Sequence, residues 1–135
     1  MYKKILLPVA LDHGRDNAEA LRVAQALVDE GGEICALTVV EPIPGYVSQY
    51  LPEEQEQASR KKVLATLTEV VAGLEGVTPE VVVGHAGRAI VDFADEHGCD
   101  CIIIASHQPG LQDYFLGSTA SRVVRHAHCA VHVIR

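Results

Sequence analysis

The stretch CDCIIIASHQPGLQDYFLGSTASRVVRHAHCAVHVI, residues 99–134, contains the pattern that decides the fold. It begins with an apolar run at 99–106 and ends with another at 129–134. Between them, a polar loop leads into a Gly-Ser-Thr step and a segment with apolar residues at helical spacing: Ala120, Val123, Val124 and Ala127. A strand, a connecting helix and a second strand in this order predict a parallel βαβ unit.

The same alternation continues toward the N-terminus. Apolar runs at 3–9, 33–40 and 78–84 predict three further strands, and their nearly unbroken hydrophobicity is typical of parallel strands covered on both faces. Three helical patterns separate the strands: one capped by Asp16 or Asn17 and stopped by Gly31-Gly32, one over Glu53–Leu74, and one over 87–98. The sequence therefore predicts an α/β fold, a three-layer, doubly wound, five-stranded parallel sheet with four helices, in a single domain over residues 1–135.

The longest predicted helix, Glu53–Leu74, has an apolar stripe that we expect to face the sheet. The stripe consists of Val63, Leu64, Leu67, Val70, Val71 and Leu74.

Composition and charge exclude several classes of function. The net charge of −7 argues against a nucleic-acid partner, because binding to phosphate backbones needs a basic face. No apolar run has membrane-spanning length, so we expect a soluble, cytoplasmic protein without a membrane partner. Four cysteines without a Cys-x-x-Cys pair predict reduced thiols, three of them in or beside apolar runs.

In a sheet of this kind, ligands bind at the carboxyl ends of the strands, which directs attention to the loops there. Asp12 follows the first strand, and two roles are open for it. Its carboxylate could accept hydrogen bonds from a ribose or a base edge, or Asp12 could simply be a turn residue. Gly117, Ser118 and Thr119 precede or open the last helix, whose unpaired N–H groups favour a phosphate. The alternative is that Ser118 is only an N-cap.

Other chemical signatures are weaker. The chain lacks a Walker-type phosphate loop, a dinucleotide-binding G-x-G-x-x-G and a G-x-S-x-G nucleophile motif. Residues 126–132, HAHCAVH, gather histidines and a cysteine, but a helix-to-strand junction scatters their side chains, so we predict no metal site. His107 lies within the candidate phosphate loop, as a phosphate contact or as a half-exposed loop residue.

The whole chain resembles the bacterial universal stress proteins. The resemblance is carried by YKKILLPVALD (2–12), by VVVGHAGRAIVDFADEHGCDCIIIASH (81–107) and by LGSTASRVVRHAHCAVHVIR (116–135). Nucleotide-binding members have the signature Gly, two residues, Gly, nine residues, then Gly-Ser or Gly-Thr. This chain keeps Gly117-Ser118 but has Ala105 and Gln108 at the two upstream glycines, so it looks like the F and G subgroup, which is also associated with ATP.

The resemblance implies the adenine nucleotide alpha hydrolase-like fold of that family, and a set of residues around ATP, with or without Mg²⁺. Pro8, Val9, Ala10 and Asp12 would line the adenosine pocket. Val39 or Val40 would present backbone to adenine, and Gly84 and His85 would close one side. The phosphates would be held by Ser106, His107, Gly117, Ser118 and Thr119. The resemblance also implies a homodimer through the C-terminal strand, with a tetramer as the alternative.

We therefore expect a stress-response module that binds ATP and has at most slow ATP hydrolysis or autophosphorylation. The alternative is a nucleotide-free universal stress protein that acts through contacts with a protein partner of unknown identity, as the missing glycines favour. A third hypothesis, a small α/β hydrolase, needs a catalytic base that the sequence does not offer. We name no catalytic residue.

Overall fold

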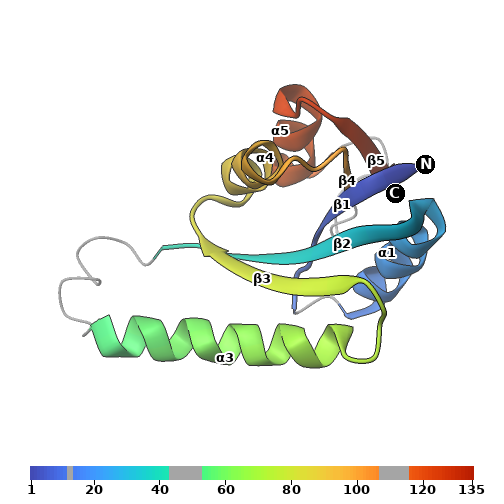
Figure 1. Ribbon diagram of the computed structural model, residues 1–135. Helices are drawn as coiled ribbons and strands as arrows, with labels where there is room; N and C mark the ends of the chain where they lie inside the picture. The colour runs from blue at the N-terminus through green and yellow to red at the C-terminus, as the bar shows by residue number, and fades with distance from the viewer. Residues whose placement is uncertain (12–13, 43–52, 107–115) are drawn as a thin grey trace.

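The computed structural model describes residues 1–11, 14–42, 53–106 and 116–135 of the chain (Figure 1). Its strands are β1 (Tyr2–Pro8), β2 (Val28–Val40), β3 (Val77–Val83), β4 (Cys101–Ala105) and β5 (Ala130–Ile134). Its helices are α1 (Gly14–Leu27), α3 (Glu53–Val71), α4 (Ala86–His97) and α5 (Ser118–His126). Every strand pair is parallel, in the order β3-β2-β1-β4-β5. The predicted α/β architecture is confirmed.

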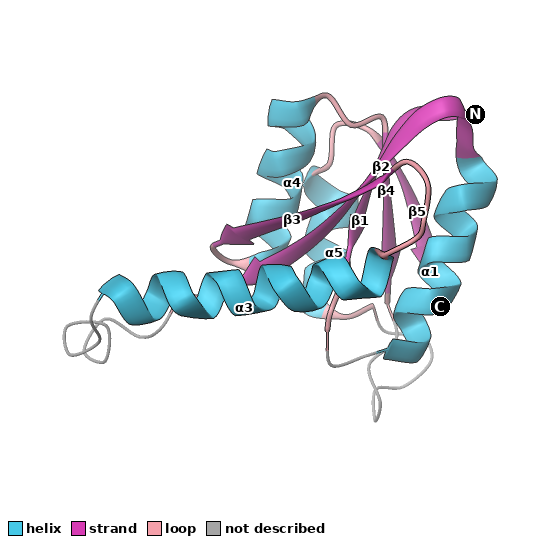
Figure 2. Ribbon diagram, turned by 60° about the horizontal axis from the view of Figure 1, so that its bottom comes forward, coloured by secondary structure: helices cyan, strands magenta, loops and turns pink. Residues whose placement is uncertain are grey.

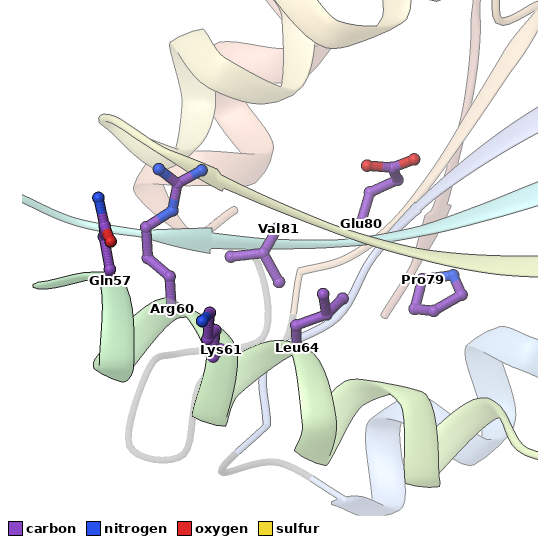
Figure 3. A pocket seen from close by; sticks show the side chains of 7 residues that line it. All are labelled: Gln57, Arg60, Lys61, Leu64, Pro79, Glu80 and Val81. Atoms are coloured by element: carbon purple, nitrogen blue, oxygen red, sulfur yellow. The ribbon is translucent and has the colours of Figure 1, made fainter. Parts of the chain in front are cut away.

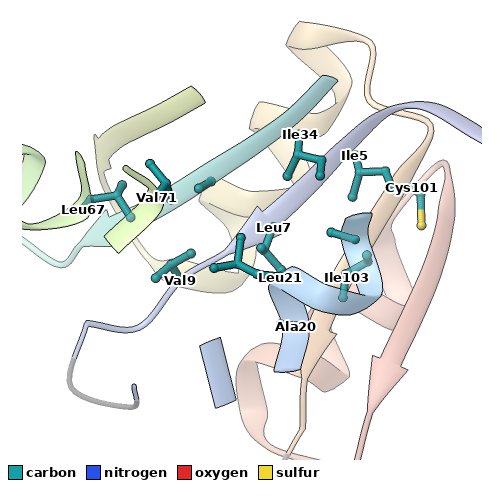
Figure 4. Packing of buried hydrophobic residues seen from close by; sticks show 12 residues of the cluster. Ile5, Leu7, Val9, Ala20, Leu21, Ile34, Leu67, Val71, Cys101 and Ile103 are labelled. Atoms are coloured by element: carbon teal, nitrogen blue, oxygen red, sulfur yellow. The ribbon is translucent and has the colours of Figure 1, made fainter. Parts of the chain in front are cut away.

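The sheet lies between two helical layers, α1 with α3 on one face and α4 with α5 on the other (Figures 1 and 2). Along β1, Ile5 and Leu7 enter the core under α1 and α3, whereas Leu6 enters the core under α4 and α5. Figure 4 shows the first of these cores, in which Ile103 of β4 packs with Leu21 of α1. Two buried faces explain why the strand sequences are almost continuously apolar.

Helix α3 buries a narrower stripe than the sequence predicts. Leu67 is fully buried and Val71 nearly so, but Leu64 and Val70 are each 40% exposed. The reason is position: α3 packs on β3 and β2 at the margin of the sheet, so only one row of its side chains is covered. The prediction that Leu64 and Val70 face the core is wrong.

The boundaries of α1 and β2 also differ from the prediction. The helix begins at Gly14, which places Asn17 inside its first turns, so the predicted cap at Asp16 or Asn17 is wrong. It ends at Leu27 rather than at Gly31-Gly32, because Val28 already pairs with Tyr2 of β1 and starts β2.

The amino-terminal edge of the sheet is held together by structural hydrogen bonds. The backbone N–H groups of Lys3 and Lys4 donate to the two carboxylate oxygens of Asp100, at 2.9 and 3.0 Å. Burial alone would raise the pKa of Asp100, but these bonds outweigh it and lower the pKa. The N-terminal ammonium pairs with Asp29 at the same edge. These groups tie β1 and β4 together and connect β1 to the start of β2.

The sequence predicts core thiols at Cys35, Cys101 and Cys129. Cys35 and Cys101 are buried and Cys129 is half-buried, and Cys99 is buried as well. Burial is the main reason that the pKa of Cys35 is raised to about 12 and the pKa of Cys101 to about 11, from an ordinary value of 9.0. Both thiols therefore bind their protons more tightly in the folded chain than in the unfolded chain.

This difference predicts a loss of stability at alkaline pH. Below pH 9 both thiols are protonated in both states, and above it only the unfolded chain releases their protons. The free energy of unfolding should then fall by up to about 1.4 kcal/mol per pH unit for each thiol. Urea unfolding between pH 8 and 10.5, under reducing conditions, measures the slope. The double variant Cys35→Ala/Cys101→Ala should show a shallower slope, and an equal slope would refute the prediction.

Candidate functional site

The strand order places one crevice at the carboxyl-terminal edge of the sheet. From β1 the chain adds β2 and β3 on one side, and then returns to add β4 and β5 on the other. The loops after β1 and β4 therefore leave in opposite directions, which opens a crevice between them. This crevice is the candidate site, and it lies at the opposite edge from the bonds of Asp100 and the N-terminus.

The backbone that follows β1 is fixed from two sides. Pro8 ends the strand, and Val9, which is buried, donates its N–H to the carbonyl of Leu37 at 2.8 Å. The Thr38 hydroxyl donates to the carbonyl of Val9 at 3.0 Å. This rim of the crevice is therefore rigid up to Val9.

Asn17 extends that support by one residue. Its side-chain amide is buried in α1 and donates to the carbonyl of Ala10 at 2.6 Å. Ala10 itself is exposed at the rim. Asn17 and Thr38 thus position the proposed adenosine-binding backbone, and sequence reasoning missed both roles. For Thr38 the available signal was a polar residue inside the apolar run 33–40, whereas Asn17 stands in a polar stretch that gave no such signal.

The ends of β2 and β3 form the next part of the edge. Val39 and Val40 are half-buried, and the N–H of Gly84 donates to the carbonyl of Val40 at 3.0 Å. His85 follows as the exposed N-cap residue of α4. Gly84 and His85 are therefore brought to Val40, but they follow β3, which is separated from β1 by β2.

Ser106, after β4, is directed toward β5. It is buried, and both its N–H and its hydroxyl donate to the carbonyl of Ile134, at 2.8 and 3.2 Å. The hydroxyl proton is thereby used within the fold, which leaves only its oxygen lone pairs for another contact. Ala105, at the position of the first signature glycine, is exposed at the end of β4.

The N-terminus of α5 provides the anion-binding geometry. Gly117 is buried and takes the N-cap position with an extended backbone (φ −60°, ψ 159°), and Ser118 is the first helical residue. The alternative in which Ser118 is the N-cap is therefore wrong. Ser118 is exposed and Thr119 is half-buried, and the N–H groups of this first turn are left without helical partners.

A second helix begins beside it. Helices α4 and α5 pack together on one face of the sheet, and the aliphatic part of the Arg122 side chain lies where a side chain on Gly87 would have to be. Both helices follow strands of a parallel sheet, so both N-termini point to the carboxyl-terminal edge. Their dipoles add a positive potential there without a lysine.

Two predicted residues, Asp12 and His107, lie outside the described residues. Within the described ranges, no group of three or more His, Cys, Asp or Glu side chains is placed to hold a metal ion. In the 126–132 segment, Nδ1 of His128 lies 3.1 Å from a carboxylate oxygen of Asp95. None of the helices in the described parts is long and apolar enough to cross a membrane.

Comparison with known proteins agrees over the whole length. Residues 1–135 match the model of the Universal stress protein family. The chain is 28% identical, over 145 residues and the full length of both proteins, to universal stress protein G of Shigella flexneri. Its fold superimposes on the hypothetical protein MJ0577 with a TM-score of 0.82 and 26% identity, covering 99% of this chain and 96% of the other.

Two more distant structures share the fold and hold nucleotides. One is a universal stress protein in complex with cAMP, with 22% identity and a TM-score of 0.69 over 99% of this chain and 97% of the other. The other is the universal stress protein from Archaeoglobus fulgidus in complex with dAMP, with 21% identity and a TM-score of 0.56 over 99% and 98%.

Proposed function

The chain belongs to the universal stress protein family, and we propose that it binds ATP in the crevice between the carboxyl ends of β1 and β4. In this proposal it acts as a cytoplasmic stress-response module that reads the nucleotide, with at most slow hydrolysis or autophosphorylation. The observation that carries the proposal is the strand order, which directs the first turn of α5, with Gly117 and Ser118, to the same edge as the backbone of Val9 and Ala10.

Each part of the edge would have a separate task. The rigid backbone of Pro8, Val9 and Ala10, with Asp12 beyond it, would contact the adenosine. Val39 or Val40 would offer backbone groups to the adenine edge, and Gly84 with His85 would close the far side. Gly117, Ser118 and Thr119 would receive the phosphates, because their N–H groups and hydroxyls lie at the positive end of α5.

The fold itself is compatible with this ligand class, since proteins sharing it have been solved with cAMP and dAMP. Ser106 would contribute through oxygen lone pairs, as to a Mg²⁺-bound water, rather than as a hydrogen-bond donor to phosphate. His107, which lies outside the described residues, would contact a phosphate through a ring nitrogen. Mg²⁺, where present, would neutralise charge on the phosphates.

Replacing Ser118 by alanine removes only the hydroxyl group and so tests its proposed contact with a phosphate. We expect ATP affinity to fall by about 1–2 kcal/mol, or five- to thirtyfold, because a hydrogen bond to a charged group is lost. Since Gly117 is the N-cap, thermal stability should hardly change. Calorimetric titration and thermal unfolding of the same variant measure both effects. Loss of stability with unchanged affinity would refute the phosphate role of Ser118.

One observation favours the nucleotide-free alternative. Ala105 replaces a signature glycine, and the neighbouring Ser106 hydroxyl is already bonded to Ile134. A family member without nucleotide would work through protein contacts alone. Heat release of bound ligand from freshly purified protein, followed by an ultraviolet spectrum, separates the two: absorbance near 260 nm supports nucleotide binding, and a clean spectrum from protein that also fails to take up added ATP supports the alternative.

For assembly, we propose a homodimer through β5, or a tetramer built from such dimers. β5 is an edge strand with a nearly charge-free sequence, AVHVI, which suits pairing with a second copy.

A further inference from the structure

At the opposite edge of the sheet, β3 pairs only with β2 among the described residues, so one row of its backbone groups faces outward. The N–H of Ile34 donates to the carbonyl of Gly76, and the N–H of Gly84 donates to the carbonyl of Val40, at 2.9 and 3.0 Å. In a parallel ladder, alternate residues of a strand turn their backbone groups to the same neighbour. The even-numbered residues of β3 therefore face β2, and the odd-numbered residues, from Val77 to Val83, face outward.

Pro79 is consistent with the outward direction of the odd-numbered residues, and it shortens the part of the edge that can form hydrogen bonds. As an odd-numbered residue, its missing N–H would have pointed to the free edge, so it removes no hydrogen bond from the sheet. Proline at an edge also discourages indiscriminate pairing of strands. Beyond Pro79, Val81 and Val83 still direct donors and acceptors outward, over the half of β3 nearer its carboxyl end.

A groove accompanies this half of the strand on the α3 side. It measures about 310 Å³, and Arg60, Lys61 and Leu64 of α3 line it opposite Val81 (Figure 3). Leu64 is the side chain that the sheet leaves 40% exposed, so the groove has an apolar floor with two cations beside it. Glu80 also lines the groove, but its carboxylate points away from α3, which carries Arg60 and Lys61 (Figure 3).

A second groove, of about 350 Å³, accompanies the strand on the α4 side. Its apolar lining is formed by Val83, Ala89 and Phe93, together with Val82. Three charged residues, Arg88, Asp92 and Glu96, also line it, and Arg88 pairs with Asp92. Val83 is 48% exposed, one of the most exposed large apolar side chains among the described residues. The outward-facing backbone of Val81–Val83 is thus bordered by a groove on each face of the sheet.

We propose that this edge, Val81–Val83 with its two grooves, binds an extended acidic segment of a partner protein by strand addition. An added strand would take up the outward backbone groups, and its side chains would alternate between the two grooves. Those on the α3 side would meet Arg60 and Lys61, which select Asp or Glu. Those on the α4 side would meet Val83, Ala89 and Phe93, which select valine or a similar apolar residue.

The net charge of the chain favours binding of an acidic segment at this site over the rest of the surface. The chain carries −7 overall, so an acidic segment is repelled by most of its surface and attracted where Arg60 and Lys61 lie together. The α3-side groove is separate from the proposed nucleotide crevice between β1 and β4. The α4-side groove also includes Gly84 and His85, which would close the far side of that crevice, so peptide binding is measured without ATP.

The probe is a fluorescent, acetylated octapeptide in which glutamate alternates with valine, titrated into the full chain and followed by anisotropy. We expect saturable binding that weakens with added salt. The same peptide with lysine in place of glutamate should bind at least about tenfold more weakly. An acidic peptide N-methylated at alternate amides should also lose about tenfold, because it cannot form the strand hydrogen bonds.

Charge reversal on the protein has a matched control one residue away. Arg60→Glu/Lys61→Glu should weaken binding at least about tenfold, whereas Lys62→Glu, outside the groove, should change it less than about threefold. Val81→Pro should abolish binding, since it removes an outward N–H and no sheet bond. Circular dichroism checks that each variant is folded, and the N-methylated peptide tests the same contact without a variant.

Three results would overturn the proposal: no binding of the acidic peptide, equal binding of the N-methylated peptide, or equal effects of reversal at Arg60/Lys61 and at Lys62. Sedimentation of the free chain adds a fourth. A fall in molecular mass on Val81→Pro would mean that a second copy of this chain covers the edge.

Discussion

Ser118→Asp should lower ATP affinity by about 100-fold or more while leaving the protein as stable as before, or slightly more stable. A carboxylate at the first position of α5 would stand where the phosphates are expected. Two like charges about 4 Å apart in a medium of effective dielectric constant near 20 repel by about 4 kcal/mol, about two to four times the loss expected for Ser118→Ala. The same carboxylate interacts favourably with the helix dipole, by about 0.3–1 kcal/mol.

Effects of opposite sign make this variant informative. A substitution that merely damaged the fold would lower affinity and stability together. Ser118→Asn, which matches aspartate in size but is uncharged, is the control and should lose no more than the roughly five- to thirtyfold in affinity expected for Ser118→Ala. Calorimetric titration with ATP and thermal unfolding without ligand measure the two quantities. Unchanged affinity in Ser118→Asp would mean that phosphate binds elsewhere or not at all.

Leu67→Ala should produce the largest loss of stability among simple truncations of α3. Leu67 is fully buried in the core between α3, α1 and the sheet, and truncating a buried leucine costs about 2–5 kcal/mol. This is a large part of the total stability of about 5–15 kcal/mol usual for a domain. Leu64→Ala, three residues earlier in the same helix, should cost less than about 1 kcal/mol, because Leu64 is already 40% exposed.

Urea unfolding of the two variants compares them directly. The pair tests how α3 is rotated on the sheet, since both leucines belong to the same apolar stripe in the sequence. Equal losses would mean that α3 buries the whole stripe, and the groove beside Leu64 and Val81 would then be closed.

The architecture could be predicted because the strongest pattern in the sequence, its continuous apolar runs, marks the buried strands of the sheet. Ile5, Leu6 and Leu7 in succession indicate a strand buried on both faces, and repetition of such runs with helical segments between them leaves few topologies. The apolar stripe of a helix does not indicate how much of that helix face the sheet will cover. Leu64 and Val70 are exposed because α3 lies at the margin of the sheet, and no local pattern carries that information.

The candidate site was predictable only in part. The place of Gly117, Ser118 and Thr119 at a helix N-terminus followed from the sequence, and the structure refined it by making Gly117 the N-cap. The bonds of Asn17 to Ala10 and of Ser106 to Ile134 join residues 7 and 28 positions apart. Such contacts depend on how the strands and helices meet in space, which spacing alone does not determine.

The Ser106 hydroxyl donates to the carbonyl of Ile134, and this bond affects how the chain could hold a phosphate. With its proton given to the carbonyl of Ile134, Ser106 is not a free donor to phosphate, so the proposed ATP binding would depend more on the first turn of α5. That reliance is the reason for choosing Ser118 for both substitutions.

The most direct test of the central claim is an equilibrium titration of the full chain with ATP, with and without Mg²⁺, by isothermal calorimetry. We predict saturable binding of one nucleotide per chain with a Kd below about 1 mM. ATP at saturating concentration should also raise the midpoint of thermal unfolding, because it binds only the folded chain. No heat of binding and no thermal shift at about 5 mM ATP, from protein shown to be folded, would contradict the claim.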